Sequence, residues 1–230
     1  MMYTQNILVA HASSTEQATF YKKTYLHVAL AVLSFIIVES FLLKVVPESI
    51  VISMISSRFL WLFLIGIFWL GSVLTTNMTM AASRDKQYLG LGLYVFLEGF
   101  LFLPLITIAI QMTGGDVIMQ AALITLFMFL GLTAVVFLTK ADFSFLRTAL
   151  VIGGFLSIGI VIVGALFGFN LGLWFSVFMV VLASGSILYQ TNQIKNQYGT
   201  AQYVGAALQL FASVMMLFWY ILRILMSRRN

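Results

Sequence analysis

The sequence predicts an all-α integral membrane protein in which seven transmembrane helices pack in one bundle. Of its 230 residues, 62% are hydrophobic and only 8% are charged, whereas a soluble domain carries about 25% charged residues. The apolar residues form long blocks and do not alternate with polar ones, as they would in the strands of a membrane β-barrel. Blocks of about 20 apolar residues are long enough to cross a bilayer as helices. The bilayer is therefore the first expected partner.

The N-terminal segment is mixed and polar, and it ends in Lys22 and Lys23. Its apolar stretch, 7–10, is shorter than the roughly 7–15 apolar residues that a signal peptide needs. We expect a cytosolic N-terminal tail at 1–24, a transmembrane domain at 25–225 and a short basic C-terminal tail at 226–230.

Seven apolar blocks follow this tail, and each predicts one transmembrane helix. Short polar turns join most of them, so that only the connections 44–58 and 190–202 are long enough to hold further structure. The predicted spans are 25–43, 59–80, 89–112, 117–138, 146–168, 171–189 and 203–225.

Lys and Arg residues predict the orientation. With seven spans, seven of the 12 lie on the N-terminal side and five on the other, which favours a cytoplasmic N-terminus. A re-entrant last segment would change this ratio to ten against two, but 203–225 is long enough to cross, so the side of the C-terminus stays open. These residues stand singly or in pairs at the ends of apolar blocks, which indicates contact with lipid headgroups and not with nucleic acid.

One charged residue lies in the middle of the third block. Between residues 89 and 110, Glu98 is the only charged side chain. A charge at the centre of a transmembrane helix costs roughly 2.5–3.5 kcal/mol on insertion scales, so it normally faces a cavity, a partner or a proton. We expect Glu98 to be protonated or to be hydrogen-bonded to Thr, Asn or Gln on neighbouring helices. A functional and a structural role both stay open.

A second acidic residue, Glu39, lies near the outer end of the first predicted span, where its side chain could snorkel toward water. Arg223 lies near the same end of the seventh span. A Glu39–Arg223 pair would fasten the first helix to the last.

Polar residues of the sixth and seventh spans cluster toward the turn that these spans share. We expect an interhelical hydrogen-bond network there, which either lines a water-filled cavity or fastens two helices. Its candidate members are Ser184, Ser186, Gln190, Gln209 and Ser213.

The sequence gives little support to a membrane enzyme. An intramembrane serine protease needs a serine nucleophile with a histidine base. The two histidines of this chain, His11 and His27, both precede the serines of the predicted spans, so no histidine follows any of those serines. Asp85, Asp116 and Asp142 are predicted to lie in turns, whereas an aspartyl protease needs two buried aspartates that share a proton. The absence of cysteine excludes thiolate chemistry, and two distant histidines do not predict a metal site. We expect no catalytic residues, no cofactor and no metal.

Four short segments of the second half of the chain carry a family resemblance. They are GDVI at 115–118, TKADFSFL at 139–146, SGSILYQTNQI at 184–194 and LFASVMMLF at 210–218. In order and spacing they resemble the Bax inhibitor (TMBIM) family, and most closely its bacterial YccA-like branch. The resemblance implies a bundle in which six helices surround the last one.

The resemblance also implies a sensor that this chain lacks. Family members pair an aspartate at the end of the sixth helix with one inside the seventh; the two share a proton and gate a pH-sensitive calcium leak. Matching the segments places Gln190 at the first position and Ser213 at the second, and neither side chain ionises near neutral pH.

Two functions follow as expectations. The resemblance to the YccA-like branch implies a regulator of membrane-protein quality control in a bacterial inner membrane, which binds and restrains a membrane-anchored ATP-dependent AAA protease; the polar tail would give the protease a segment to grasp. The alternative is a pH-sensitive cation leak for calcium or protons. In it, Glu98 would supply charge, and the region of Gln190 and Ser213 would supply neutral oxygen ligands.

Overall fold

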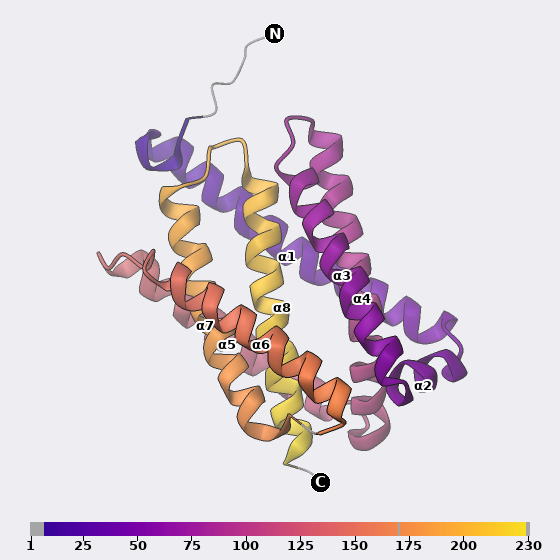
Figure 1. Cartoon of the computed structure of the whole chain (residues 1–230). Coiled ribbons are helices and arrows are strands. Elements are labelled where there is room, and N and C mark those ends of the chain that lie inside the picture. The colour runs from indigo at the N-terminus through magenta and orange to yellow at the C-terminus, as the bar shows by residue number, and fades with distance from the viewer. Residues whose placement is uncertain (1–6, 170, 229–230) are drawn as a thin grey trace.

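Eight α-helices and one short 3-10 helix make up the part of the chain that the computed structural model describes, residues 7–169 and 171–228 without the side chain of Arg58 (Figure 1). No strand occurs among these residues. The elements are η1 (Val9–His11), α1 (Ser14–Val45), α2 (Glu48–Ser56), α3 (Arg58–Thr79), α4 (Arg84–Thr113), α5 (Asp116–Leu138), α6 (Leu146–Phe167), α7 (Gly172–Asn196) and α8 (Tyr203–Ser227).

Seven of these helices are long and apolar enough to cross a membrane, and each corresponds to one of the predicted spans, which extend past the helix by at most one residue. The short helix α2 fills the connection 44–58. The fold class is therefore confirmed. Helices α1, α4, α6 and α8 begin at the end of the bundle where the described chain starts, which we call the N-terminal end; α3, α5 and α7 finish there (Figure 1).

Helix α1 is longer than its membrane span. It begins at Ser14, where the Ser13 hydroxyl accepts from the Glu16 backbone N–H and the Glu16 carboxylate accepts from the Ser13 N–H, a capping box that satisfies the first free N–H groups. A helix of 32 residues is about 48 Å long, against a hydrocarbon core of about 30 Å. Part of the predicted tail, residues 14–24, is therefore helical.

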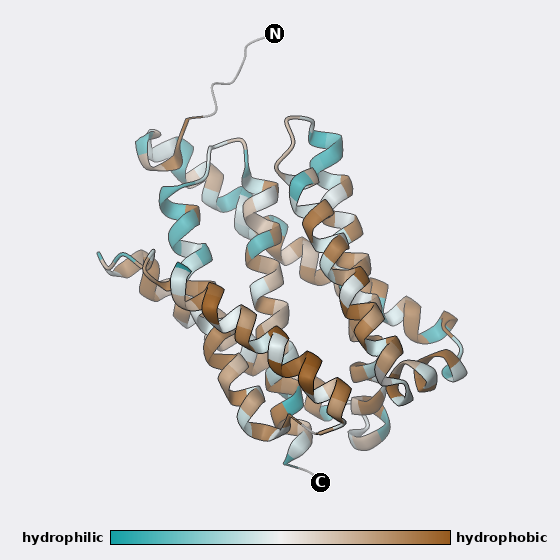
Figure 2. Cartoon of the chain, in the orientation of Figure 1, coloured by the Kyte–Doolittle hydropathy of each residue, from teal (hydrophilic) through white to brown (hydrophobic). Residues whose placement is uncertain are grey.

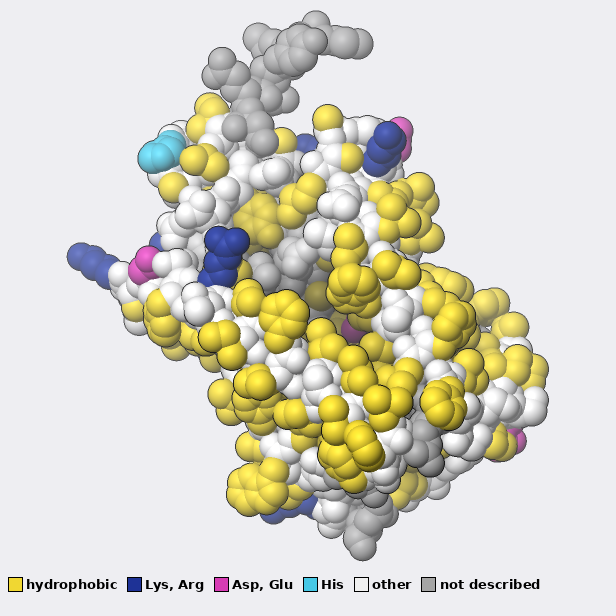
Figure 3. Space-filling view, viewed as in Figure 1, with side chains coloured by type: hydrophobic (Ala, Val, Ile, Leu, Met, Phe, Trp, Pro, Cys, Tyr) yellow, Lys and Arg dark blue, Asp and Glu magenta, His cyan; other side chains and the backbone are white. Residues whose placement is uncertain are grey.

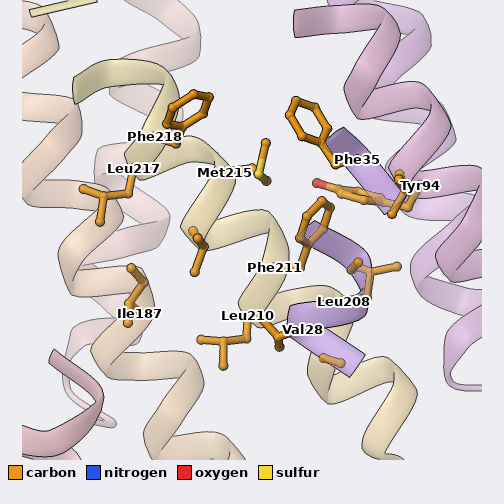
Figure 4. Packing of buried hydrophobic residues seen from close by; sticks show 14 of the residues in the cluster. Val28, Phe35, Tyr94, Ile187, Leu208, Leu210, Phe211, Met215, Leu217 and Phe218 are labelled. Carbon is orange, nitrogen blue, oxygen red and sulfur yellow. The ribbon is translucent and has the colours of Figure 1, made fainter. Parts of the chain in front are cut away.

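Helix α8 lies at the centre of the bundle. It packs against α1, α3, α4, α5 and α7, and it has buried residues from Tyr203 to Met226. Figure 4 shows its side chains pointing to different neighbours: Leu210 and Leu217 approach Ile187 of α7, whereas Phe211 and Met215 point toward Tyr94 of α4. Since lipid tails are as apolar as these side chains, close packing holds such a bundle together, more than exclusion from water does.

The outer faces of the surrounding helices are apolar. Figure 2 shows hydrophobic residues along the middle of the helices and hydrophilic ones gathered mainly at the N-terminal end, and hydrophobic side chains cover most of the face in Figure 3. Trp174, Phe127 and Leu138 are 84%, 72% and 84% exposed. This surface suits lipid as its neighbour.

Helices α3 and α4 approach each other closely at Gly90. A Cβ atom on Gly90 would lie 2.8 Å from Cβ of Met78 and 2.9 Å from the backbone oxygen of Thr75. Because one of these atoms belongs to the backbone, the neighbour cannot simply rotate away. The crossing of α3 over α4 therefore requires glycine at position 90.

Candidate functional site

The polar residues of the last two spans form contacts both within and between helices. The hydroxyls of Ser186 on α7 and Ser213 on α8 are hydrogen-bonded at 2.8 Å, and the Ser213 hydroxyl lies 3.0 Å from the backbone oxygen of Gln209. The Gln209 amide donates to the Thr76 hydroxyl of α3 at 3.2 Å. Ser184 only donates to Val180 of its own helix. These bonds fasten α8 to α7 and α3.

A pocket of about 340 Å³ opens at the N-terminal end, where α7 finishes and α8 begins. Its size lies within the range of small-ligand sites, and amides and phenols dominate its lining. Ser213 is not among the lining residues, which are Met80, Tyr189, Gln190, Gln193, Gln197, Tyr198, Gln202 and Gln209. We call this the glutamine pocket.

The spacing of residues on α7 explains this lining. Gln190, Gln193 and Gln197 recur at intervals of three and four residues, which places them on one face of a helix. Helix α7 continues to Asn196, two turns past the predicted end of its span, so this face extends beyond the apolar block. The sequence contained this periodic signal, but the prediction ended the helix at residue 189 and did not use it.

The glutamine pocket holds no formal charge. Burial raises the pKa of Tyr198, in the connection between α7 and α8, to about 12, so its phenol is neutral at physiological pH. The other lining residues are five glutamines, a second tyrosine and a methionine. Each amide both donates and accepts hydrogen bonds. Such a lining suits uncharged polar groups better than a bare ion.

The start of the described chain is bound to the connection beside this pocket. The backbone N–H of Val9 donates to the oxygen of Tyr198, and the N–H of Thr200 donates to the oxygen of Ile7, both at 2.9 Å. Leu8 and Gly199 thereby form an antiparallel bridge, and Val9 is fully buried. We call this bridge and the Val9 anchor the N-terminal clasp. Residues 7–13 are therefore not a free tail.

Glu39 does not snorkel, and its predicted partner is not bonded to it. Its side chain is 5% exposed, and both carboxylate oxygens are buried without a hydrogen-bond partner. The carboxylate lies in the α1–α4 interface, where a Cβ on Gly99 would be 3.6 Å from Glu39 Oε2. The long, oblique path of α1 (Figure 1) brings Glu39 to the middle of α4, while Arg223 lies near the far end of α8. The Glu39–Arg223 pair, which would have fastened the first helix to the last, is therefore not formed.

Glu98 lies at the same level of α4, beside Gly99. It is 4% exposed, and its Oε2 atom is buried without a hydrogen-bond partner. The hydroxyl of Tyr94, one turn earlier, interacts with the carboxyl. No Thr, Asn or Gln of another helix is bonded to that oxygen in the described structure, so the expected interhelical hydrogen bond to it is not formed.

Glu98 and Ser213 lie on different sides of α8. Ser213 faces α7 through Ser186, whereas Phe211, two positions earlier, packs edge-on against Tyr94 of α4. Residues two apart on a helix point about 200° apart. The structure therefore joins Ser213 to the region of the glutamine pocket, and it does not bring Glu98 into that region.

Aromatic and basic side chains meet beside Tyr203 at the start of α8. Lys23 and Arg84 lie 5.2 Å and 4.5 Å from the centre of its ring, close enough for cation–π attraction. His27 contacts the Tyr88 hydroxyl at 3.2 Å. Sequence reasoning considered His27 only as an enzymatic base or a metal ligand and missed this cluster, because its members come from three distant segments. Among the described residues, no three His, Cys, Asp or Glu side chains gather as a metal site would require.

The comparisons with known proteins agree with this architecture. The family model described as "Inhibitor of apoptosis-promoting Bax1" matches residues 17–230. The chain is 35% identical over 138 residues to an uncharacterized protein of Pseudomonas aeruginosa, covering 60% of this chain and 58% of that protein. It is 32% identical over 177 residues to Bax inhibitor 1 of Schizosaccharomyces pombe, covering 73% and 63%.

A further relative is an uncharacterized membrane protein of Vibrio cholerae, 32% identical over 133 residues, covering 55% of this chain and 57% of that protein. The matches span about three fifths of the length of these curated relatives. The family match is nearly complete and includes all seven long helices, at least in part. The chain therefore belongs to the Bax inhibitor family.

Proposed function

We propose that this protein binds and restrains a membrane-anchored ATP-dependent AAA protease, and that it thereby regulates membrane-protein quality control. The glutamine pocket is the observation that carries this proposal. It is uncharged, it opens at one end of the bundle, and its amides offer both donors and acceptors. A polypeptide segment presents the matching backbone groups.

The N-terminal clasp supports the idea that this protein restrains the protease and is not degraded by it. A AAA protease pulls on an unstructured end, and residues 7–13 are held by backbone hydrogen bonds and by the buried Val9 side chain. Residues 1–6, the first part of the predicted handle, lie outside the described residues. A protease that engages this end must break the clasp before it can unfold α1, which favours binding without destruction.

The proposal places the N-terminal end in the cytoplasm of a bacterium and the bundle in its inner membrane. The excess of Lys and Arg on that side supports this orientation. The relatives from Pseudomonas aeruginosa and Vibrio cholerae support a bacterial setting. The catalytic sites of a AAA protease face the cytoplasm, so the glutamine pocket would lie on the same side.

Site-specific photocrosslinking tests the proposal. A photoreactive amino acid at Gln193 or Gln197 in the pocket should crosslink to the AAA protease of the expressing bacterium. The same amino acid at Gln120, exposed on α5, is the matched control and should not. Overproduction of the wild-type protein should slow turnover of a known protease substrate, and Gln193→Ala should restore it. Equal crosslinking at all three positions, or turnover unchanged by the wild-type protein, would contradict the proposal.

A cation leak remains a second candidate, since polar side chains continue from the pocket into the bundle. Gln190 lines the pocket, and Ser186 and Ser213 form the next polar contact. Neutral oxygens of this kind can replace part of an ion's hydration shell. Calcium and proton flux into liposomes with the purified protein tests the leak, beside Ser213→Ala and Glu98→Gln. Flux lowered by Ser213→Ala alone would support a path through this region, and no flux above empty liposomes would remove the candidate.

A further inference from the structure

Two cations from different helices lie against one aromatic ring at the N-terminal end. Lys23 Nζ of α1 and Arg84 Cζ of α4 are 5.2 Å and 4.5 Å from the centre of the Tyr203 ring of α8. Helix α1 passes behind the first half of α8 in Figure 1, and both helices pack against α4. The ring is 8% exposed, whereas both cationic side chains are exposed, so they are accessible from outside the bundle.

Hydrogen bonds fix this arrangement. The Arg84 guanidinium donates to the backbone oxygen of Ala201, just before α8, at 2.7 Å. The Tyr203 hydroxyl lies 3.4 Å from the hydroxyl of Tyr88, which also contacts His27 at 3.2 Å. The fold therefore holds the guanidinium and the ring in defined positions, as a binding site requires.

The two positive charges are not balanced by acidic side chains. Among the residues that the structure describes, neither Lys23 nor Arg84 forms an ion pair with a carboxylate. The surrounding segments add two more cations, Lys22 and Lys86, and only one acidic residue, Asp85. Like charges held near one ring repel each other. An anion bound beside them would remove this repulsion.

The level of the cluster favours a lipid headgroup over a soluble anion. Lys23 and Arg84 stand just before the apolar blocks of α1 and α4, where lipid headgroups lie. The next turns of these helices expose apolar side chains, since Leu26, Leu30 and Leu89 are 52%, 47% and 57% exposed. A phospholipid presents its phosphate and its acyl chains in the same order. Basic pockets between transmembrane helices are known to suit such headgroups.

We propose that Lys23, Arg84 and Tyr203 form a binding site for the phosphate of an anionic phospholipid. The planar guanidinium donates to two phosphate oxygens, and the ammonium adds a point charge. The ring keeps both side chains at one place. A lipid bound there would join α1, α4 and α8 at this end of the bundle. None of the three residues lines the glutamine pocket, so the site is independent of protease binding.

Native mass spectrometry of the purified full-length protein tests this site. Phosphatidylglycerol and phosphatidylcholine with the same acyl chains are the probes, because only the first carries a net negative charge. We expect phosphatidylglycerol to bind more tightly. Lys23→Ala and Arg84→Ala should each lower its affinity about fivefold, the usual effect of one basic residue at an anionic surface. The affinity for phosphatidylcholine should not change.

Lys22→Ala and Lys86→Ala are the matched controls. Each removes one exposed positive charge at the same end of the bundle, from a side chain that does not lie over the Tyr203 ring. Both variants should bind phosphatidylglycerol as the wild type does. Arg84→Lys keeps the charge and should bind this lipid more tightly than Arg84→Ala. The melting temperature of each variant verifies that it is folded.

Equal binding of the two lipids to the wild-type protein would overturn the proposal. Controls that weaken binding as much as Lys23→Ala and Arg84→Ala would also overturn it, because binding would then depend only on the overall positive charge of this end. Glycerol 3-phosphate tests for a soluble ligand. If it displaces phosphatidylglycerol at equal concentration, the site takes a free phosphate ester and not a lipid.

Discussion

At the scale of single residues, Asp142 connects one loop to a distant helix. Its carboxylate accepts from the backbone N–H of Ser144 at 3.0 Å, from the Ser144 hydroxyl at 2.7 Å and from the Asn192 amide of α7 at 3.0 Å. Asp142 lies outside the membrane spans, between α5 and α6. The hydrogen bonds from Ser144, followed by that from Asn192, lower the pKa of Asp142 below its ordinary value of 3.8.

This lowered pKa gives a pH-dependent prediction. Because the folded-state pKa lies below that of the unfolded chain, the carboxylate stabilises the fold above about pH 4, and the contribution is lost as the pH falls through the folded value. Asp142→Asn should therefore lower the melting temperature slightly at pH 7, and the difference from wild type should shrink below pH 4. In a Ser144→Ala background, Asp142→Asn should lower the melting temperature at pH 7 by a smaller amount. A difference that stays constant down to pH 3 would contradict this account.

Sequence reasoning identified most of the polar residues that make contacts inside the bundle, and it misplaced one of them, Glu39. The contact between Ser186 and Ser213 lies where clustered polar residues near a shared turn predicted a network. Glu39 was expected to reach water because it is near the end of its apolar block. The position of Glu39 in the bundle depends on where α1 begins and on how the helix is tilted. Neither can be inferred from the spacing of residues in the sequence. The buried carboxyl therefore became visible only in the packed bundle.

At the scale of helices, a glycine sets the distance between α3 and α4. We predict that Gly90→Ala destabilises the protein by about 1–3 kcal/mol, the usual cost of overpacking, since its Cβ would meet the Thr75 backbone oxygen at 2.9 Å. Gly92 lies on the same helix with no such atom within 4 Å. Gly92→Ala is the matched control and should be neutral or slightly stabilising. Thermal unfolding in detergent measures both variants; equal melting temperatures would argue against a close crossing at Gly90.

The helices themselves could be predicted well from the sequence, because hydrophobic blocks of fixed length report membrane spans directly. Each of the seven blocks corresponds to one long helix. The predictions were least accurate for α1 and α7, whose helices continue into polar sequence at the N-terminal end. Hydropathy does not detect such extensions. They carry the capping box of α1 and two of the five glutamines that line the pocket, Gln190 and Gln193.

At the scale of the whole molecule, the orientation in the membrane is the next property to measure. The chain has no native cysteine, so single cysteines report topology without background. Lys140 and Met112 are exposed near opposite ends of the bundle. With a cytoplasmic N-terminus, a membrane-impermeant maleimide should label Met112→Cys in intact cells, and Lys140→Cys only after the membrane is permeabilised. The opposite pattern would place the glutamine pocket outside the cytoplasm and contradict the protease proposal.

The central position of α8 has a consequence for biosynthesis. Because α8 is the last of the seven spans, a ribosome delivers the other six helices to the membrane before the one that they surround. Until it arrives, Thr76 and Ser186 lack the partners that Gln209 and Ser213 later provide, and the faces that will pack on α8 remain open to lipid. Assembly can therefore be completed only after α8 has entered the membrane, and a chain that stops before Tyr203 would present an unfinished, polar-lined interior to the membrane.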